Sequence, residues 1–274
     1  MQKPHDSEAT TWLAVLRASG RSPNTLTSYS ATLRQFEEIL GSTREGTLAT
    51  VTKAEAIAAV EQMRFRWTPG GVSLRLRVLR TFYNWLVNEE VIPRSPFRGI
   101  SVKVPDEPQK TASDEDVERM LAGASKRDTA IVLLLADTGA RKGEVAALEP
   151  RDIDLDSGSV HFRVSKSRPR FVPLSDRAVV ALARWLRQRG TAPGSLWKSQ
   201  DPYSLITAVI KRRSHGTLTA HTLRRRFASN WLKQGLSETS LMRICGWSSL
   251  QMIATYSRAA ADEISEAEYR RFIA

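Results

Sequence analysis

The chain has a single cysteine, Cys245, among its 274 residues, and this scarcity excludes a disulfide framework and a thiolate zinc cluster. Its four histidines show no metal-ligand spacing, such as two on one helix face, so the sequence predicts no metal site. The longest apolar run, from Ala130 to Ala136, is far shorter than the roughly 20 residues of a membrane span, and it indicates a buried helix. The N-terminus lacks the apolar region of a secretion signal. We therefore expect a protein of the cytoplasm or nucleoid with no membrane partner.

Positive charge is in clear excess. Lys and Arg number 41 against 29 Asp and Glu, which gives a formal net charge of +12. The excess is present in both halves of the chain. Each phosphate that a lysine or arginine neutralises releases condensed counterions, so this surplus favours a polyanionic partner such as nucleic acid.

Residues 103–112 carry two prolines and no apolar periodicity, which is typical of a linker. Before this segment, apolar residues recur at helical spacing and predict an all-helical domain over residues 1–102. The third of its helices is expected from about Lys53 to Arg66, with Pro69-Gly70-Gly71 as a break, and the fourth from Val72 to Asn88.

After the linker, residues 113–274 form the second predicted domain. Ser113 is an expected helix N-cap, because acidic residues follow it in the first turn. Three short strands are expected at 152–155, 159–164 and 170–174. Helices are expected near 113–123, 127–138, 176–189, 202–212, 221–234, 237–245, 248–259 and 262–273. The predicted fold class is mainly α with a small antiparallel β-sheet, in two domains.

Several arginines are candidates for contacts with DNA phosphates. They lie on the fourth helix of the first domain and beside the loop between the second and third strands: Arg75, Arg77, Arg80, Arg168 and Arg170. Most such runs of charge are solvated helix faces. The candidate phosphate-binding residues of the second domain favour the DNA-binding interpretation here.

Two residue pairs in the second domain suggest a phosphate-binding site. Arg141 and Glu144 are three residues apart at a helix start, and His221 and Arg224 are three apart on another helix, so each pair shares one face. Arginine presents a planar fork of donors that matches two phosphate oxygens, so two arginines can clamp one diester. The alternative for the first pair is a structural Arg–Glu ion pair.

Three further residues complete a possible reaction centre. Tyr256 offers a phenol with an ordinary pKa of about 10, which attacks only if its charge is stabilised or its proton is accepted. Trp247 offers an indole N–H that can bond a phosphate oxygen. Lys166, between the second and third strands, could protonate a departing 5′-hydroxyl. Taken singly, the tyrosine could be a core residue and the lysine a solvated one.

This chain resembles the tyrosine recombinase family, the phage integrases and their Xer-like relatives. The resemblance rests on six residues in a fixed order along the chain: Arg141, Lys166, His221, Arg224, Trp247 and Tyr256. The box Thr138-Gly-Ala-Arg-Lys-Gly-Glu144 is similar to the first arginine box of that family, His221-Thr-Leu-Arg224 to the second, and the segment from Leu241 to Tyr256 to the third. The resemblance extends to the first domain through Ser22-Pro-Asn-Thr-Leu26 with Tyr29, and through Leu79-Arg-Thr-Phe-Tyr-Asn-Trp-Leu86. Two departures are Trp247, where most members have histidine, and Arg225, where histidine is frequent.

The resemblance implies a role for each residue. Arg141, His221 and Arg224 would bind and activate the scissile phosphate, and Tyr256 would attack it to leave a 3′-phosphotyrosyl link. Lys166 would act as general acid, Glu144 would orient Arg141 and His221, and Trp247 would support the phosphate. Strand exchange would then need neither nucleotide nor metal, so no cofactor is expected.

The resemblance also implies the architecture and the partners. A SAM-like, core-type DNA-binding domain would precede the α+β catalytic domain, and the two would clamp double-stranded DNA core sites. The residues before Ser22 are too few for a separate arm-binding domain. The final helix, with Ile264, Ala267 and Phe272 on one stripe, would dock into a neighbour in a homo-tetramer on DNA. The alternative is that this helix packs back on its own domain. A directionality factor is a possible further partner.

The expected function is site-specific recombination, with phage or mobile-element integration and excision as its setting. One alternative is a type IB topoisomerase-like nicking and closing enzyme, against which the core-binding helices argue. The other is a non-catalytic DNA-binding regulator derived from a recombinase, against which the complete catalytic set argues.

Overall fold

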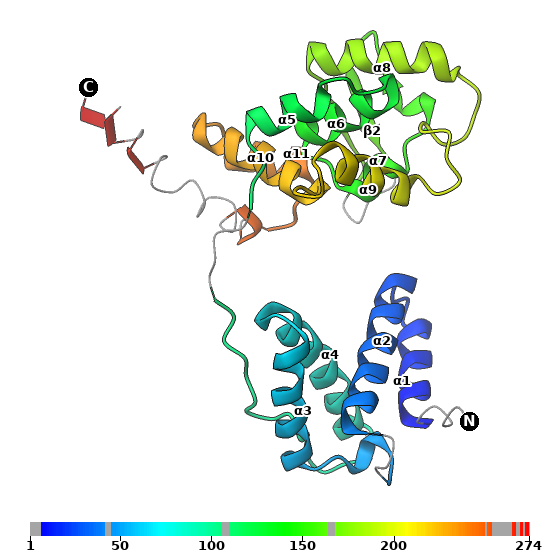
Figure 1. Ribbon diagram of the computed structural model, residues 1–274, viewed down its shortest axis with the longest axis vertical. Helices are drawn as coiled ribbons and strands as arrows, with labels where there is room; N and C mark the ends of the chain where they lie inside the picture. Colours follow the sequence, from blue (N-terminus) through cyan, green and yellow to red (C-terminus); the bar gives the residue numbers. More distant parts are fainter. Residues whose placement is uncertain are drawn as a thin grey trace. The chain divides into compact units, whose positions relative to one another are not determined.

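The computed structural model describes residues 7–41, 45–105, 110–163, 168–249, 251–253, 265–266, 269–270 and 272–273. The chain divides into two compact units, Met1–Glu107 and Pro108–Ala274 (Figure 1). The first unit is helical in all its described regular elements, and the second is mainly helical with one small antiparallel sheet. The mixed α-plus-sheet fold class expected from the sequence is confirmed.

Over its described residues, the first unit is a bundle of four α-helices with one short 3-10 helix. These elements are α1 (Ser7–Ala18), α2 (Pro23–Leu40), η1 (Leu48–Thr50), α3 (Lys53–Arg66) and α4 (Pro69–Asn88). Ser22 caps α2 and Thr52 caps α3, each by accepting a backbone N–H three residues on. The buried core is rich in aromatic rings, among them Trp12, Phe36, Phe82, Tyr83 and Phe97. The hydroxyl of Tyr83 donates to the carbonyl of Leu48 at 2.8 Å, so this buried hydroxyl has a hydrogen-bond partner.

The start of α4 differs from the prediction. Pro69-Gly70-Gly71 was expected to separate two helices, but these residues form the first turn of α4 itself. Thr68 is the N-cap and accepts the backbone N–H of Gly71 at 3.3 Å. Proline fits the first position of a helix because its missing N–H would have no intrahelical partner there. The break between α3 and α4 therefore falls at Trp67 and Thr68.

The second unit contains seven described α-helices, one 3-10 helix and three strands. In chain order they are α5 (Asp114–Leu121), α6 (Lys126–Thr138), α7 (Lys142–Ala146), η2 (Pro150–Asp152), β1 (Ile153–Asp154), β2 (Ser159–Phe162), β3 (Arg170–Pro173), α8 (Asp176–Arg189), α9 (Pro202–Arg213), α10 (Ala220–Lys233) and α11 (Glu238–Cys245). Ser113 caps α5 in a capping box with Asp116, as the sequence predicted.

The helix α6 is the centre of this unit and packs against α8 and α10 (Figure 1). Its run from Ala130 to Ala136 is buried throughout, as expected. The three strands form a sheet in the order β1-β2-β3, antiparallel at both pairings. The inward face of this sheet carries Val160, Phe162 and Val172, which pack into the same core as α6. A second, smaller cluster joins α10 to α11 through Leu232, Leu241 and Cys245. This packing brings the C-terminal end of α11 to α10.

The last part of the chain is described only in places. Residues 251–253 are helical, within the helix predicted at 248–259. Residues 265–266, 269–270 and 272–273 are helical, within the helix predicted at 262–273. Phe272 is exposed, whereas Ile264 and Ala267 of the predicted stripe lie outside the described residues.

Candidate active site

A tight turn after α6 positions the first arginine. Gly139 ends α6 in the left-handed conformation, with φ of 59°, and Arg141 is the N-cap of α7 two residues later. A Cβ atom at Gly139 would lie 2.5 Å from the ring of Phe227, so both the backbone conformation and the close packing require glycine. The hydroxyl of Thr138 accepts the N–H of Ala140 at 3.2 Å and fixes the path of the turn.

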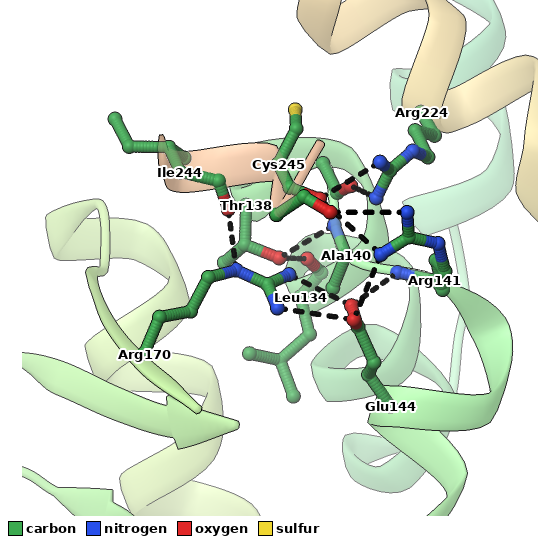
Figure 2. Close-up of polar contacts among 11 residues, drawn as sticks. Leu134, Thr138, Ala140, Arg141, Glu144, Arg170, Arg224, Ile244 and Cys245 are labelled. Carbon is green, nitrogen blue, oxygen red and sulfur yellow. Dashed lines mark hydrogen bonds and ion pairs between the residues drawn. The ribbon is translucent and has the colours of Figure 1, made fainter. Parts of the chain in front are cut away.

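Arg141 is held by a carboxylate and by the end of another helix (Figure 2). Its Nη1 donates to Oε1 of Glu144 at 3.2 Å, and its backbone N–H donates to Oε2 of the same carboxylate at 2.8 Å. Its Nη2 donates to the carbonyl of Gly246 at 3.1 Å, and its Nη1 lies 3.5 Å from the carbonyl oxygen of Cys245. The side chain remains 30% exposed, so solvent or a ligand can reach it.

Arg224 is buried and meets Arg141 at a shared carbonyl. Its Nη2 donates to the carbonyl of Cys245 at 2.8 Å, and its Nη1 to the carbonyl of Gly139 at 2.5 Å (Figure 2). Only 2% of the residue is exposed. Its guanidinium carbon lies 5.1 Å from the ring centroid of Trp247, which is within cation–π range. The two arginines of the separate sequence boxes therefore converge on one point.

The ends of two helices make this pairing of like charges possible. Both α6 and α11 end in a left-handed glycine, Gly139 and Gly246. The carbonyls that accept from Arg141 and Arg224 belong to these glycines and to Cys245, the last residue of α11. The C-terminus of a helix carries partial negative charge and carbonyls without intrahelical partners, so it binds cations favourably. The two helix ends offset the repulsion between the guanidinium groups.

Glu144 binds a second arginine that the sequence placed elsewhere. Arg170 was predicted to contact DNA, but its Nη1 and Nη2 donate to Glu144 at 3.0 and 2.8 Å, and its Nε donates to the carbonyl of Ile244 at 2.6 Å (Figure 2). Its side chain is only 9% exposed, and that of Glu144 only 2%. Arg170 therefore acts inside the protein, because a buried carboxylate requires this neutralisation.

A signal for the role of Arg170 was present in the sequence. Alternate residues of a strand share one face, and Arg170 shares its face with Val172, which is buried. The predicted strand at 170–174 thus implied an inward-pointing arginine. The backbone acceptors at Gly139, Cys245 and Gly246 gave no such signal, because a carbonyl is present at every position.

His221 lies at the start of α10, one turn before Arg224. Desolvation lowers its pKa below the ordinary value of 6.5, and the positive charges of Arg225, Arg224 and Arg141 lower it further. This lowered pKa favours the neutral form of the imidazole near pH 7. Trp247, directly after the glycine that ends α11, is 6% exposed.

These four residues line one cavity of about 510 Å³. Arg141, His221, Arg224 and Trp247 are joined there by Lys142 and Lys211 on the basic side, and by Tyr203, Ile210 and Met252 among the less polar groups. Among the described residues that line the cavity there is no aspartate or glutamate. Two guanidinium groups in a largely apolar hollow make a binding site for an anion, since low polarity strengthens their attraction for it.

Two predicted catalytic residues lie outside the described residues. They are Lys166, in the segment 164–167, and Tyr256, in the segment 254–264. The structure thus brings together five of the seven predicted catalytic residues: Arg141, Glu144, His221, Arg224 and Trp247.

The predicted DNA contacts of the first unit have different environments. Arg75 donates to Gln35 of α2 at 2.9 Å and its guanidinium lies 3.7 Å from the ring centroid of Trp67, so it joins elements of the helical bundle. Arg80 donates to the carbonyl of Ile100. Arg77 is exposed, as is Arg168 in the second unit.

Cys245 is fully buried, and desolvation raises the pKa of its thiol to about 11, so it is a packed residue and not a nucleophile. Within the described ranges, no group of three His, Cys, Asp or Glu side chains could hold a metal ion. Among the helices that the structure describes, none has the length and apolar character needed to cross a membrane.

Comparison with known proteins adds independent observations. Residues 110–263 match the phage integrase family, and residues 9–90 match the phage integrase N-terminal SAM-like domain. The tyrosine recombinase XerC of Salmonella typhi is 30% identical over 226 residues, which cover 79% of this chain and 71% of that protein. XerC of Escherichia coli O6:K15:H31 is 29% identical over 79% of this chain and 72% of that protein.

Solved structures share the fold at lower identity. The integrase of the transposon Tn1549, in complex with a circular intermediate DNA, gives a TM-score of 0.75 at 19% identity and covers 97% of this chain and 99% of that one. A lambda integrase dimer bound to a core site gives a TM-score of 0.74 at 17% identity, covering 91% of this chain and 94% of that one.

Proposed function

The chain belongs to the phage integrase family of tyrosine recombinases, and from this premise we propose that it cuts and rejoins double-stranded DNA at core sites through a 3′-phosphotyrosyl link to Tyr256. The observation that carries this proposal is the meeting of Arg141 and Arg224 at the carbonyl of Cys245, on the wall of a cavity whose described lining residues are free of acidic side chains.

In the first step, the scissile phosphate enters this cavity. Arg141 and Arg224 bind its non-bridging oxygens, and His221 and Trp247, which line the same cavity, contribute further contacts. Phosphoryl transfer places negative charge on the equatorial oxygens, so fixed positive charges stabilise the transition state. Glu144 and Arg170 hold Arg141 in place, which spares the reaction the cost of ordering it.

In the second step, the phenol oxygen of Tyr256 attacks phosphorus and the bond from phosphorus to the 5′-oxygen breaks. The phenol proton passes to a base, a role that we assign to the imidazole of His221, which lines the same cavity. Lys166 gives a proton to the departing 5′-oxygen. Tyr256 is four residues beyond Met252, which lines the cavity, and this closeness in sequence supports the assignment. Rejoining reverses these transfers with a 5′-hydroxyl from the partner strand.

Two structural relatives support DNA as the partner of this chain. The Tn1549 integrase was solved in complex with a circular intermediate DNA, and the lambda integrase as a dimer on a core site. We extend DNA binding to this chain and propose that four copies assemble on two core sites through the final helix. A directionality factor would bias integration against excision, in the cytoplasm or nucleoid of a bacterial host.

The test is covalent trapping on a nicked suicide substrate, on which the cut strand cannot be rejoined. The wild-type chain should form a protein–DNA adduct, and Tyr256→Phe should bind the same DNA and form none. Tyr203→Phe is the matched control, because Tyr203 lines the same cavity and loses the same atom. Adduct formation by Tyr256→Phe would place the nucleophile elsewhere.

Two companion assays separate the alternatives. Recombination between two sites, measured beside relaxation of a supercoiled plasmid with one site, distinguishes a recombinase from a nicking and closing enzyme. Specific binding with no adduct from the wild-type chain would identify a non-catalytic regulator.

A further inference from the structure

The first unit has a pocket of its own, beyond the end of α4. It has a volume of about 290 Å³. Three arginines line it, namely Arg80 from α4 and both Arg94 and Arg98 from the segment after it. Asn84 and Ser95 add an amide and a hydroxyl. No aspartate or glutamate occurs among the lining residues that the structure describes.

The wall that carries Arg94 and Arg98 is fixed to the core. Phe97 between them is fully buried, and its ring centroid lies 5.1 Å from that of Tyr83. The hydroxyl of Ser95 accepts the backbone N–H of Phe97 at 3.3 Å, and the carbonyl of Ser95 accepts that of Arg98 at 3.2 Å, which closes a turn. The pocket is thus preformed and needs little ordering when a ligand binds.

The three guanidinium groups differ in what holds them. Arg80 donates to the carbonyl of Ile100, which anchors it against the wall. Lys53 donates to the carbonyl of Arg98, so the backbone of that arginine is fixed as well. No hydrogen bond or ion pair engages the side chain of Arg94 or Arg98 within the part of the chain that the structure describes, and both residues are exposed. Three like charges around one hollow, with no acidic side chain among the described residues that line it, favour an external anion.

We propose that this pocket seats one phosphodiester of the DNA backbone, a contact that rests on the proposed function and lies in the other unit from the reaction centre. Guanidinium forks match paired phosphate oxygens, and Asn84 and Ser95 can donate further hydrogen bonds. Such a contact carries no sequence information, and it fixes the register of the first unit on the duplex.

The test compares two double variants of the full chain that lose the same charge. Arg94→Gln/Arg98→Gln removes the two exposed arginines of the pocket and leaves the anchored Arg80. Arg17→Gln/Arg21→Gln is the control, because both arginines are exposed near the end of α1 and neither lines the pocket. Binding to a core-site duplex is measured over a range of salt concentrations, and ethylation interference maps the phosphates that matter.

The pocket variant should bind DNA roughly tenfold more weakly than the control variant, since a charge-assisted contact of this kind contributes on that scale. The dependence of log K on log salt should lose about one unit of slope, as expected for one phosphate fewer. A phosphate whose ethylation weakens binding by the wild-type chain should no longer matter for the pocket variant. Adduct formation at saturating protein should persist, which separates this inference from the proposed function.

Equal affinity, equal salt slope and an unchanged interference pattern in the two double variants would overturn the inference, even if the wild-type chain cleaves DNA. Binding of inorganic phosphate tests the alternative ligand, a free phosphate anion in place of a DNA phosphodiester. If it binds at Arg94 and Arg98 while their removal leaves DNA binding unchanged, the pocket takes a free anion and the assignment to the DNA backbone is wrong.

Discussion

Replacement of Arg170 by methionine tests whether a residue outside the cavity governs the geometry of the reaction centre. Arg170→Met keeps an aliphatic stem of similar length and removes three charge-assisted hydrogen bonds, two to Glu144 and one to Ile244. Breaking a buried ion pair costs about 3–5 kcal/mol. Because Arg141 still neutralises Glu144 at 3.2 Å, we expect the lower end, about 3 kcal/mol.

The assay is urea denaturation of the full chain, with Arg184→Met as the control for loss of an exposed arginine from the same unit. The control should change the free energy of unfolding by less than about 0.5 kcal/mol. Arg170→Lys should recover part of the loss, since one ammonium can pair with Glu144 but cannot match the fork. In a double-mutant cycle with Glu144→Gln, the coupling energy should reach about 2 kcal/mol.

The same variant should react slowly even where it is fully folded. Loss of about 1.4 kcal/mol of transition-state stabilisation through a displaced Arg141 corresponds to a tenfold slower formation of the covalent adduct. Arg170→Lys should restore part of this rate. If Arg170→Met matched Arg184→Met in both stability and adduct formation, Glu144 would not depend on Arg170. Arg170 would then have no part in holding Arg141 in place.

Two further predictions concern the turn and the histidine. Gly139→Ala should lower the free energy of unfolding by clearly more than Gly123→Ala. Both glycines have positive φ, which costs an alanine about 1–2 kcal/mol. Only at Gly139 would the added Cβ also meet the ring of Phe227. Equal losses in urea denaturation would contradict this. Because the pKa of His221 is lowered in the folded state, the unfolded chain binds more protons below about pH 6.5, so stability falls as pH falls through that window. Relative to His221→Asn, the wild-type chain should lose stability between pH 7.5 and 5. If the difference in free energy of unfolding between the two chains stayed constant over this range, the pKa of His221 would not be lowered by folding.

Local signals in the sequence were sufficient for most elements. Ser22 and Ser113 precede helices whose first turns suit an N-cap, and both are caps in the structure. The buried run of α6 was readable from its apolar residues alone. The start of α4 was misplaced because a proline–glycine pair signals a break and also suits a first helical turn, and only the cap at Thr68 decides between these.

For the site, the sequence by itself determined the chemistry: which side chains carry fixed charge, a titratable ring or a phenol, and in what order they occur. Side-chain identity is a local property, so the two arginine boxes could be found without coordinates. Only the tertiary structure decided what surrounds them. The carbonyls of Gly139, Cys245 and Gly246 became ligands for guanidinium groups because two helices end at the same place. Arg170 turned from a predicted DNA contact into a partner of Glu144 because strand β3 faces the core. Such roles depend on distances between residues remote in the chain, and packing alone sets those distances.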